Sequence, residues 1–159
     1  MQAYLRQPGM TAECPYHGNS PRVSSGPACT ASPYLAMPHL VIEITENTRL
    51  NCSPEELLDE ANAALLASGE FGEADIKSRC ITLSTFRQGV QAAERAFVHA
   101  RLSILDGREL AVRRALGQAV CDVIAEAVRP ANAEGQSVQI SVEVSEMERA
   151  SYAKQIVGG

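Results

Sequence analysis

The sequence predicts an α/β (α+β) domain of two consecutive β-α-β units, with a four-stranded sheet and both helices on one face of it. Three observations support this prediction. Three short segments alternate apolar and polar residues, a fourth is a further strand candidate, and two longer segments repeat apolar residues at helical spacing. The composition also changes abruptly near residue 37, in a chain whose 159 residues suit one compact domain. We therefore expect a domain over residues 38–159, preceded by a leader over residues 1–37.

The leader lacks the pattern of a folded segment. Residues 1–36 contain five of the eight prolines, a single Glu and neither Asp nor Lys. Such a stretch buries too little apolar surface to offset its ordering entropy, and it has no apolar core of the kind found in secretory signals. We expect residues 1–37 to be disordered and absent from the mature protein. A regulatory tail is the alternative.

The first unit begins directly after this boundary. Residues 39–46 (HLVIEITE) alternate apolar and polar side chains, which predicts a half-buried strand. Ser53 as N-cap, Pro54 at the first helical position and Glu56 at N3 predict a capping box, and Gly69 is expected to end the helix. The apolar face of this helix comprises Leu57, Leu58, Ala61, Ala64 and Leu65.

The pattern then repeats. Residues 96–104 (AFVHARLSI) alternate again, and Asp106 with Glu109 three residues later predicts a second capping box. A long helix follows and ends before Pro130. Its apolar stripe comprises Val112, Ala115, Leu116, Ala119, Val120, Val123, Ile124 and Ala127.

Two further strands complete the units, over residues 77–85 and 138–144. A right-handed crossover makes the two strands of each unit parallel and places both helices on the same face of the sheet. The other face is semi-polar, so we expect either water or a partner subunit to cover it.

The composition excludes several classes of function. A net charge of −5 and an isoelectric point of about 5.2 argue against a nucleic-acid binder, which usually presents a basic face. No apolar run approaches the roughly 18 residues that cross a membrane. The five Cys are scattered without a CxxC pair, which predicts free thiols in the cytoplasm. No metal and no organic cofactor is implied, because the chain has no ligand cluster and no GxGxxG or P-loop string.

Four strings of residues carry a resemblance. They are residues 37–43 (MPHLVIE), 75–79 (DIKSR), 96–99 (AFVH) and 107–108 (GR), in this order on the doubled β-α-β frame. Over about residues 38–150 the chain resembles the 5-carboxymethyl-2-hydroxymuconate isomerases of the tautomerase superfamily. The resemblance implies a tautomerase-like fold, a homotrimer and a cofactor-independent isomerase that acts through an N-terminal proline.

The resemblance places this proline at position 38. A free N-terminal proline is a secondary amine, and burial or a nearby positive charge lowers its pKa toward the neutral range in which a general base is efficient. While Met37 precedes it, however, the nitrogen of Pro38 belongs to an amide and has no basic lone pair. We therefore expect translation to start at Met37 and this Met to be removed. The alternative for Pro38 is a residue that merely starts a strand.

The resemblance also implies the substrate, a small carboxylated hydroxydienoate of the 5-carboxymethyl-2-hydroxymuconate type, from homoprotocatechuate or 4-hydroxyphenylacetate catabolism. Arg108 is then catalytic beside Pro38, and Lys77, Arg79 and His39 bind the substrate. Arg108 is expected just inside the second helix, where the helix dipole disfavours a cation and a functional reason is needed. A solvated arginine, and charges on a strand surface at 77 and 79, are the alternatives.

Two other functions remain open at this point. One is another activity of the superfamily, such as a 4-oxalocrotonate-type or phenylpyruvate tautomerase. The other is a non-catalytic trimeric binding domain, which is favoured if the leader stays attached. No nucleic acid or membrane partner is expected in any of these cases.

Overall fold

The computed structural model describes residues 37–129 and 136–158, all within the unit Ser32–Gly159. The prediction of a disordered leader concerns residues that lie outside the described ones, apart from Met37. The elements follow the predicted order: β1 (His39–Thr45), α1 (Pro54–Ala67), η2 (Glu73–Asp75), β2 (Lys77–Leu83), β3 (Arg95–Leu105), α2 (Leu110–Val128), β4 (Ser137–Met147) and η3 (Arg149–Ser151).

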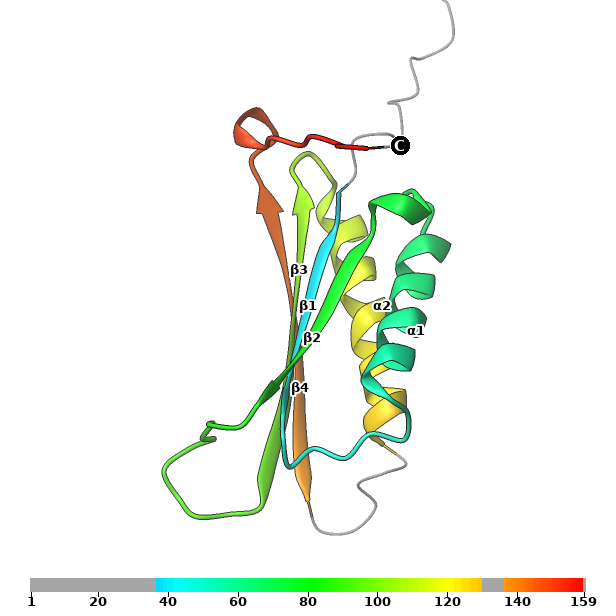
Figure 1. The fold of residues 1–159 in the computed structure, drawn as a ribbon. Coiled ribbons are helices and arrows are strands. Elements are labelled where there is room, and N and C mark those ends of the chain that lie inside the picture. The colour runs from blue at the N-terminus through cyan, green and yellow to red at the C-terminus, as the bar shows by residue number, and fades with distance from the viewer. Residues whose placement is uncertain (1–36, 130–135, 159) are drawn as a thin grey trace, which may run out of the picture. The chain divides into compact units, whose positions relative to one another are not determined.

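The four strands form one mixed sheet in the order β2-β1-β3-β4. β1 is parallel to β2, and β3 is parallel to β4, as expected for two β-α-β units. The central pair, β1 and β3, is antiparallel and joins the units. Both helices cover the same face of this sheet (Figure 1). The predicted architecture is therefore confirmed.

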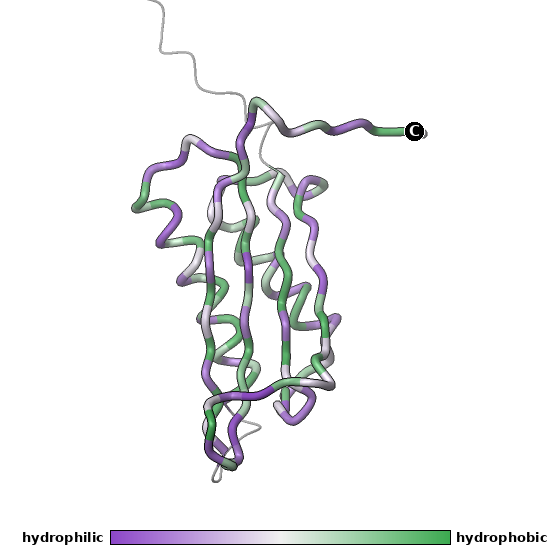
Figure 2. Tube along the Cα trace, turned by 90° about the vertical axis from the view of Figure 1, so that its left-hand side faces the viewer, coloured by the Kyte–Doolittle hydropathy of each residue, from purple (hydrophilic) through white to green (hydrophobic). Residues whose placement is uncertain are grey.

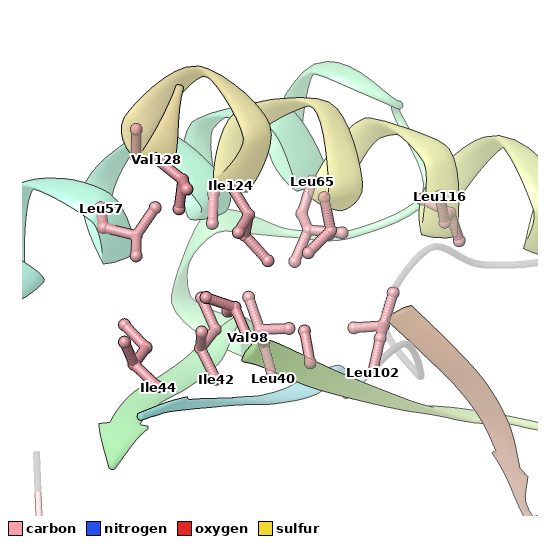
Figure 3. Packing of buried hydrophobic residues seen from close by; sticks show 14 of the residues in the cluster. Leu40, Ile42, Ile44, Leu57, Leu65, Val98, Leu102, Leu116, Ile124 and Val128 are labelled. Carbon is pink, nitrogen blue, oxygen red and sulfur yellow. The ribbon is translucent and has the colours of Figure 1, made fainter. Parts of the chain in front are cut away.

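The hydrophobic core lies between the helices and the sheet. Figure 3 shows side chains of both helices, among them Leu65 of α1 and Ile124 of α2, facing Leu40 and Ile42 of β1. All four are fully buried, and each contributes about 1.5–3 kcal/mol by leaving water. The inward positions of β3 are also fully buried: Ala96, Val98, Ala100, Leu102 and Ile104.

The opposite face of the sheet, called the open face below, is semi-polar as predicted. Figure 2 shows hydrophilic and hydrophobic residues alternating along the strands. Polar residues that are opposite each other on β3 and β4 pair their side chains on this face. Nδ1 of His99 lies 2.9 Å from Oγ of Ser141, and Nε of Arg101 lies 3.6 Å from Oε2 of Glu143. The open face thus presents a mixed surface, in which paired polar side chains alternate with half-buried apolar residues such as Val41 and Phe97.

Helix α1 begins as its sequence predicts. Oγ of Ser53 accepts a hydrogen bond from the backbone N–H of Glu56 (3.2 Å), and the Glu56 carboxylate accepts one from the N–H of Ser53 (2.8 Å). This reciprocal capping box, with Pro54 in the first turn, satisfies two backbone donors that the helix itself cannot pair. Gly69 follows the helix with a φ of +74°, a conformation that favours glycine.

The predicted capping box of the second helix is wrong. α2 begins at Leu110, and its N-cap, Glu109, makes no side-chain hydrogen bond to the helix. Asp106 binds Arg149 instead: its carbonyl accepts a hydrogen bond from Nη2 (3.0 Å), and its carboxylate lies 3.5 Å from Nε. A turn through Gly107, with φ of +100°, separates Asp106 from the helix. Asp106, which the local sequence pattern predicts as the N-cap of the second helix, is therefore bound by Arg149 instead.

Candidate functional site

One end of the sheet, at the top of Figure 1, gathers the segments that carry the predicted site residues. β1 and β2 start at this end because they are parallel, and β3 ends there because it is antiparallel to β1. His39 is opposite Lys77 of β2 on one side and Ser103 of β3 on the other. The 3₁₀ turn η3 and the C-terminal segment that follow β4 lie at the same end (Figure 1).

Pro38 is buried immediately before β1. Its carbonyl oxygen accepts a hydrogen bond of 3.1 Å from the backbone N–H of Lys77, which extends the β1–β2 ladder by one step. The nitrogen of Pro38 is joined to Met37 by a peptide bond, so in this chain it is an amide nitrogen. The sheet thus fixes the position of the Pro38 ring, while its nitrogen chemistry depends on Met37.

Met37 is enclosed by charged groups. The residue is only 4% exposed. Its Sδ lies 3.0 Å from Nζ of Lys154 and 3.8 Å from Nζ of Lys77. Asp75 holds both ammonium groups: its carboxylate lies 2.9 Å from Nζ of Lys154, and its carbonyl accepts a hydrogen bond of 3.2 Å from Lys77. Two cations therefore converge beside the residue that precedes Pro38.

His39 points to the open face beside these cations. Its Nε2 lies 3.2 Å from the hydroxyl of Tyr152 in the C-terminal segment. Burial above all, and then the positive charges of Lys77 and Arg79, lowers the pKa of His39 below its ordinary value of 6.5. At neutral pH a neutral imidazole can form this hydrogen bond with Tyr152 without adding a further positive charge beside the cations of Lys77 and Arg79.

Arg79 lies one step further along the open face. It is opposite Val41 of β1, two residues after Lys77, so both cations of β2 project from the same face. Arg79 is exposed and forms no hydrogen bond or ion pair with any residue in the described part of the chain. Its guanidinium therefore has its donors available to an anion from solution.

Arg108 occupies a different position from the one predicted. It stands two residues before α2 rather than inside it, and its side chain is only 13% exposed. Nε bonds Oε2 of Glu70 (3.0 Å), Nη2 the carbonyl of Glu70 (3.2 Å) and Nη1 the carbonyl of Leu105 (3.1 Å). The guanidinium also lies 5.0 Å from the ring centroid of Phe71. All three nitrogens thus bind groups of the same chain, and Arg108 fastens the segment after α1 to the end of β3.

The structure brings Pro38, His39 and Lys77 together, with Arg79 next in line. It adds Lys154 and Asp75, which the sequence analysis did not assign to the site. Asp75 stood in one of the matching strings without a role. The sequence contains one signal for Lys154, since it is one of only two lysines in 159 residues. In the structure both lysines contact Met37.

Other features of the described residues do not point to a site. No group of three or more His, Cys, Asp or Glu in the described ranges could hold a metal ion, and no helix there is long and apolar enough to span a membrane. A groove of about 390 Å³ lies between α2 and β4, with Arg113, Gly117 and Ile140 among its lining residues. None of the predicted site residues lines it.

Comparison with known proteins gives consistent results. Residues 38–156 match the family model of 5-carboxymethyl-2-hydroxymuconate isomerase. The 5-carboxymethyl-2-hydroxymuconate Delta-isomerase of Escherichia coli is 29% identical over 119 residues, 75% of this chain and 94% of that protein. The crystal structure of a 5-carboxymethyl-2-hydroxymuconate isomerase from Deinococcus radiodurans R1 is 31% identical with a TM-score of 0.68, and the match covers 77% of this chain and 92% of that one. A structure described as a Q0 fused 4-OT wild type symmetric trimer shares the fold at 13% identity and a TM-score of 0.57, over 73% of this chain and 90% of that one.

The lowered pKa of His39 predicts an acid-sensitive fold. Between the folded pKa and 6.5 the unfolded chain binds a proton that the folded chain does not, so the unfolding free energy should fall as the pH is lowered through this window. Urea unfolding at a series of pH values measures this fall. His39→Gln should flatten it, and His99→Gln, which leaves His39 in place, should not. An equal pH slope in wild type and His39→Gln would contradict the prediction.

The contacts of Arg108 predict a role in stability. Arg108→Met removes an ion pair and leaves two carbonyl oxygens without their donor, so the unfolding free energy should fall by roughly 1–3 kcal/mol. Arg129→Met is the matched control, because the Arg129–Glu126 pair is about 70% exposed and contributes no more than about 1 kcal/mol. Equal losses in the two variants, measured by urea unfolding, would show that the buried contacts of Arg108 add nothing.

Proposed function

Since the chain belongs to the 5-carboxymethyl-2-hydroxymuconate isomerase family of the tautomerase superfamily, we propose that it converts hydroxydienoates of the 5-carboxymethyl-2-hydroxymuconate type to their keto isomers. The observation that supports this most directly is the position of Pro38. It is buried just before β1, where Lys77 and Lys154 contact the residue that precedes it and His39 follows it in the strand. A buried base flanked by cations suits an acidic, negatively charged substrate.

In the proposed reaction Pro38 acts as a general base and then as a general acid. Its free secondary amine takes the proton of the dienol hydroxyl, electron density moves through the conjugated system, and the same proton is returned to carbon to give the ketone. Charge that develops on the oxygen and the carboxylates of the substrate is stabilised by the ammonium of Lys77 and the guanidinium of Arg79. Arg79 is suited to this role because its donors are not engaged by described residues.

The proposal requires removal of Met37 and everything before it. With Met37 in place the nitrogen of Pro38 cannot take a proton, and the Met37 side chain fills the space between the two lysines. The active species is then residues 38–159. The matched segment covers 94% of the Escherichia coli relative and 92% of the Deinococcus radiodurans structure, so the similar region corresponds to nearly all of each of these proteins.

Arg108 takes part in a more restricted way. Its Nε is bonded to Oε2 of Glu70, so a substrate carboxylate reaches this nitrogen only by displacing Glu70. The proposal therefore assigns substrate contact to Lys77 and Arg79 first, and assigns to Arg108 both a positive charge at this end of the sheet and the anchoring of the Glu70 segment.

We further propose that the domain is a homotrimer in which the open face of the sheet meets the partner subunits. The support is the semi-polar character of this face and the fold that the chain shares with a protein described as a symmetric trimer. Half-buried Val41 lies on this face between Arg79 and Arg101, its register partners.

The proline mechanism predicts three rates. The domain 38–159, with a free Pro38 verified by intact mass, should turn over the conjugated dienol in an ultraviolet assay. The full chain should be slower by about 100-fold or more, as expected for loss of a general base. The Pro38→Ala domain should also be slower, because its N-terminal amine is primary and lacks the ring that fixes the orientation of the nitrogen. Pro54→Ala, a matched proline change at the start of α1, should keep the rate of the domain. Full turnover by a chain that retains its leader, or by Pro38→Ala, would eliminate the proline mechanism. No turnover by the domain with a free Pro38 would leave the binding domain.

The proposed assembly predicts a mass three times that of the subunit in light scattering. Val41→Arg places a third cation beside Arg79 and Arg101, which a face open to water tolerates but a covered face does not, so this variant should dissociate. Leu66→Arg, at a 42% exposed position on α1, is the control and should remain trimeric. A monomeric wild-type domain would refute the assembly.

A further inference from the structure

The C-terminal segment after β4 is fastened at three points to the end of the sheet that carries the candidate site. Arg149 donates a hydrogen bond of 3.0 Å to the carbonyl of Asp106, and the Tyr152 hydroxyl lies 3.2 Å from Nε2 of His39. The third point is Lys154, whose Nζ lies 2.9 Å from the carboxylate of Asp75. Beyond it the chain is loosely held, since Ile156 and Val157 are 77% and 88% exposed.

Within the described residues, which end at 158, Lys154 is the last one of the segment that forms a hydrogen bond or ion pair, and it contacts the residue before Pro38. Its Nζ is 3.0 Å from Sδ of Met37, closer than Nζ of Lys77 at 3.8 Å. An ammonium group has three donors. In Lys154 one of them serves Asp75 and one meets a thioether, which is only a weak acceptor. A charged donor placed against such a poor partner becomes available as soon as that partner leaves.

We propose that Lys154 is a positioning residue of the site: once Met37 is removed, its ammonium, held by Asp75, stands in the vacated space facing the nitrogen of Pro38 and keeps this amine unprotonated. The inference rests on the proposed function in one respect, namely that Pro38 becomes the N-terminus. It goes beyond that function because it assigns a role to the C-terminal segment, which contributes no strand or helix to the sheet and its cover.

The physical basis is the repulsion of like charges. Five covalent bonds separate Sδ of Met37 from the nitrogen of Pro38, so the two lysines in contact with Sδ lie in the same neighbourhood as the new amine. Protonating the amine would add a third positive charge to this partly buried neighbourhood, which is unfavourable. Asp75 offsets part of the Lys154 charge but also prevents the ammonium from swinging into solvent. Lys77 acts in the same direction from β2.

The inference is tested by titrating Pro38 directly. The domain 38–159 contains three prolines, and only Pro38 has a titratable nitrogen, so selective ¹⁵N-proline labelling gives an NMR signal that follows its protonation. Lys154→Met should move the titration midpoint of Pro38 to higher pH. The acidic limb of the kcat/KM profile should move to higher pH with it, because the base is then protonated over a wider range.

Two variants serve as controls. Lys154→Arg retains a positive charge at the site and should leave the midpoint close to that of wild type. Arg129→Met removes one charge at the far end of α2 and should also leave it unchanged. If Lys154→Met does not fold, the titration midpoint of Pro38 is measured in Lys154→Gln instead. An unchanged midpoint in the neutral variants, or an equal shift in Arg129→Met, would overturn the inference.

The titration is independent of turnover. If the proposed isomerase activity is wrong, no variant turns over the dienol while the NMR midpoints still report on Lys154. If the role of Lys154 is wrong, wild type turns over the substrate and the midpoint does not respond to Lys154→Met.

Discussion

The antiparallel pairing of β1 with β3 is the constraint on which the rest of the structure depends. The two strands of each β-α-β unit are parallel. In a unit alone, both strands would therefore begin at one end of the sheet, and the helix would begin at the other end. Joining the units head to tail through β1 and β3 places the start of one unit beside the finish of the other. The inward side chains of both central strands are fully buried under the helices, so this pairing cannot slip without exposing the core.

The candidate site is a direct product of that arrangement. It takes the first residues of β1 and β2 from one unit, and the turn after β3 and the tail after β4 from the other. No local stretch of sequence contains these groups together. The same geometry explains why Arg108 and Lys154 differ so much: one is bound on all sides by its own chain, while the other holds a single carboxylate and a weak acceptor.

The fold could be predicted from the sequence to the extent that its signals are local. Alternation predicts β1, β3 and β4, whereas β2 is only a strand candidate because its residues do not alternate. The Ser53–Glu56 box predicts the start of α1 because its two partners are three residues apart. The second box failed because Arg149, more than forty positions away, binds Asp106. The alternation in residues 39–46 predicts that Thr45 lies on the polar face of its strand, yet Thr45 is fully buried, and its hydroxyl bonds the backbone of Phe97 on the neighbouring strand. Long-range hydrogen bonds of this kind produce no periodic pattern in the sequence.

The candidate site shows the same contrast between local and long-range signals. Pro38, His39 and Lys77 come together through the register of predicted strands, whereas Lys154 lies in a segment without a recognisable pattern.

The scarcity of lysine in this chain has a practical consequence for studying it. With only Lys77 and Lys154 in the whole sequence, a domain that begins at Pro38 carries all of its aliphatic amines in one cluster. A reagent that modifies amines without regard to position therefore behaves on this domain as a site-directed label. Reductive methylation with ¹³C-formaldehyde would give a spectrum in which every resonance comes from the candidate site, with no background from the rest of the surface.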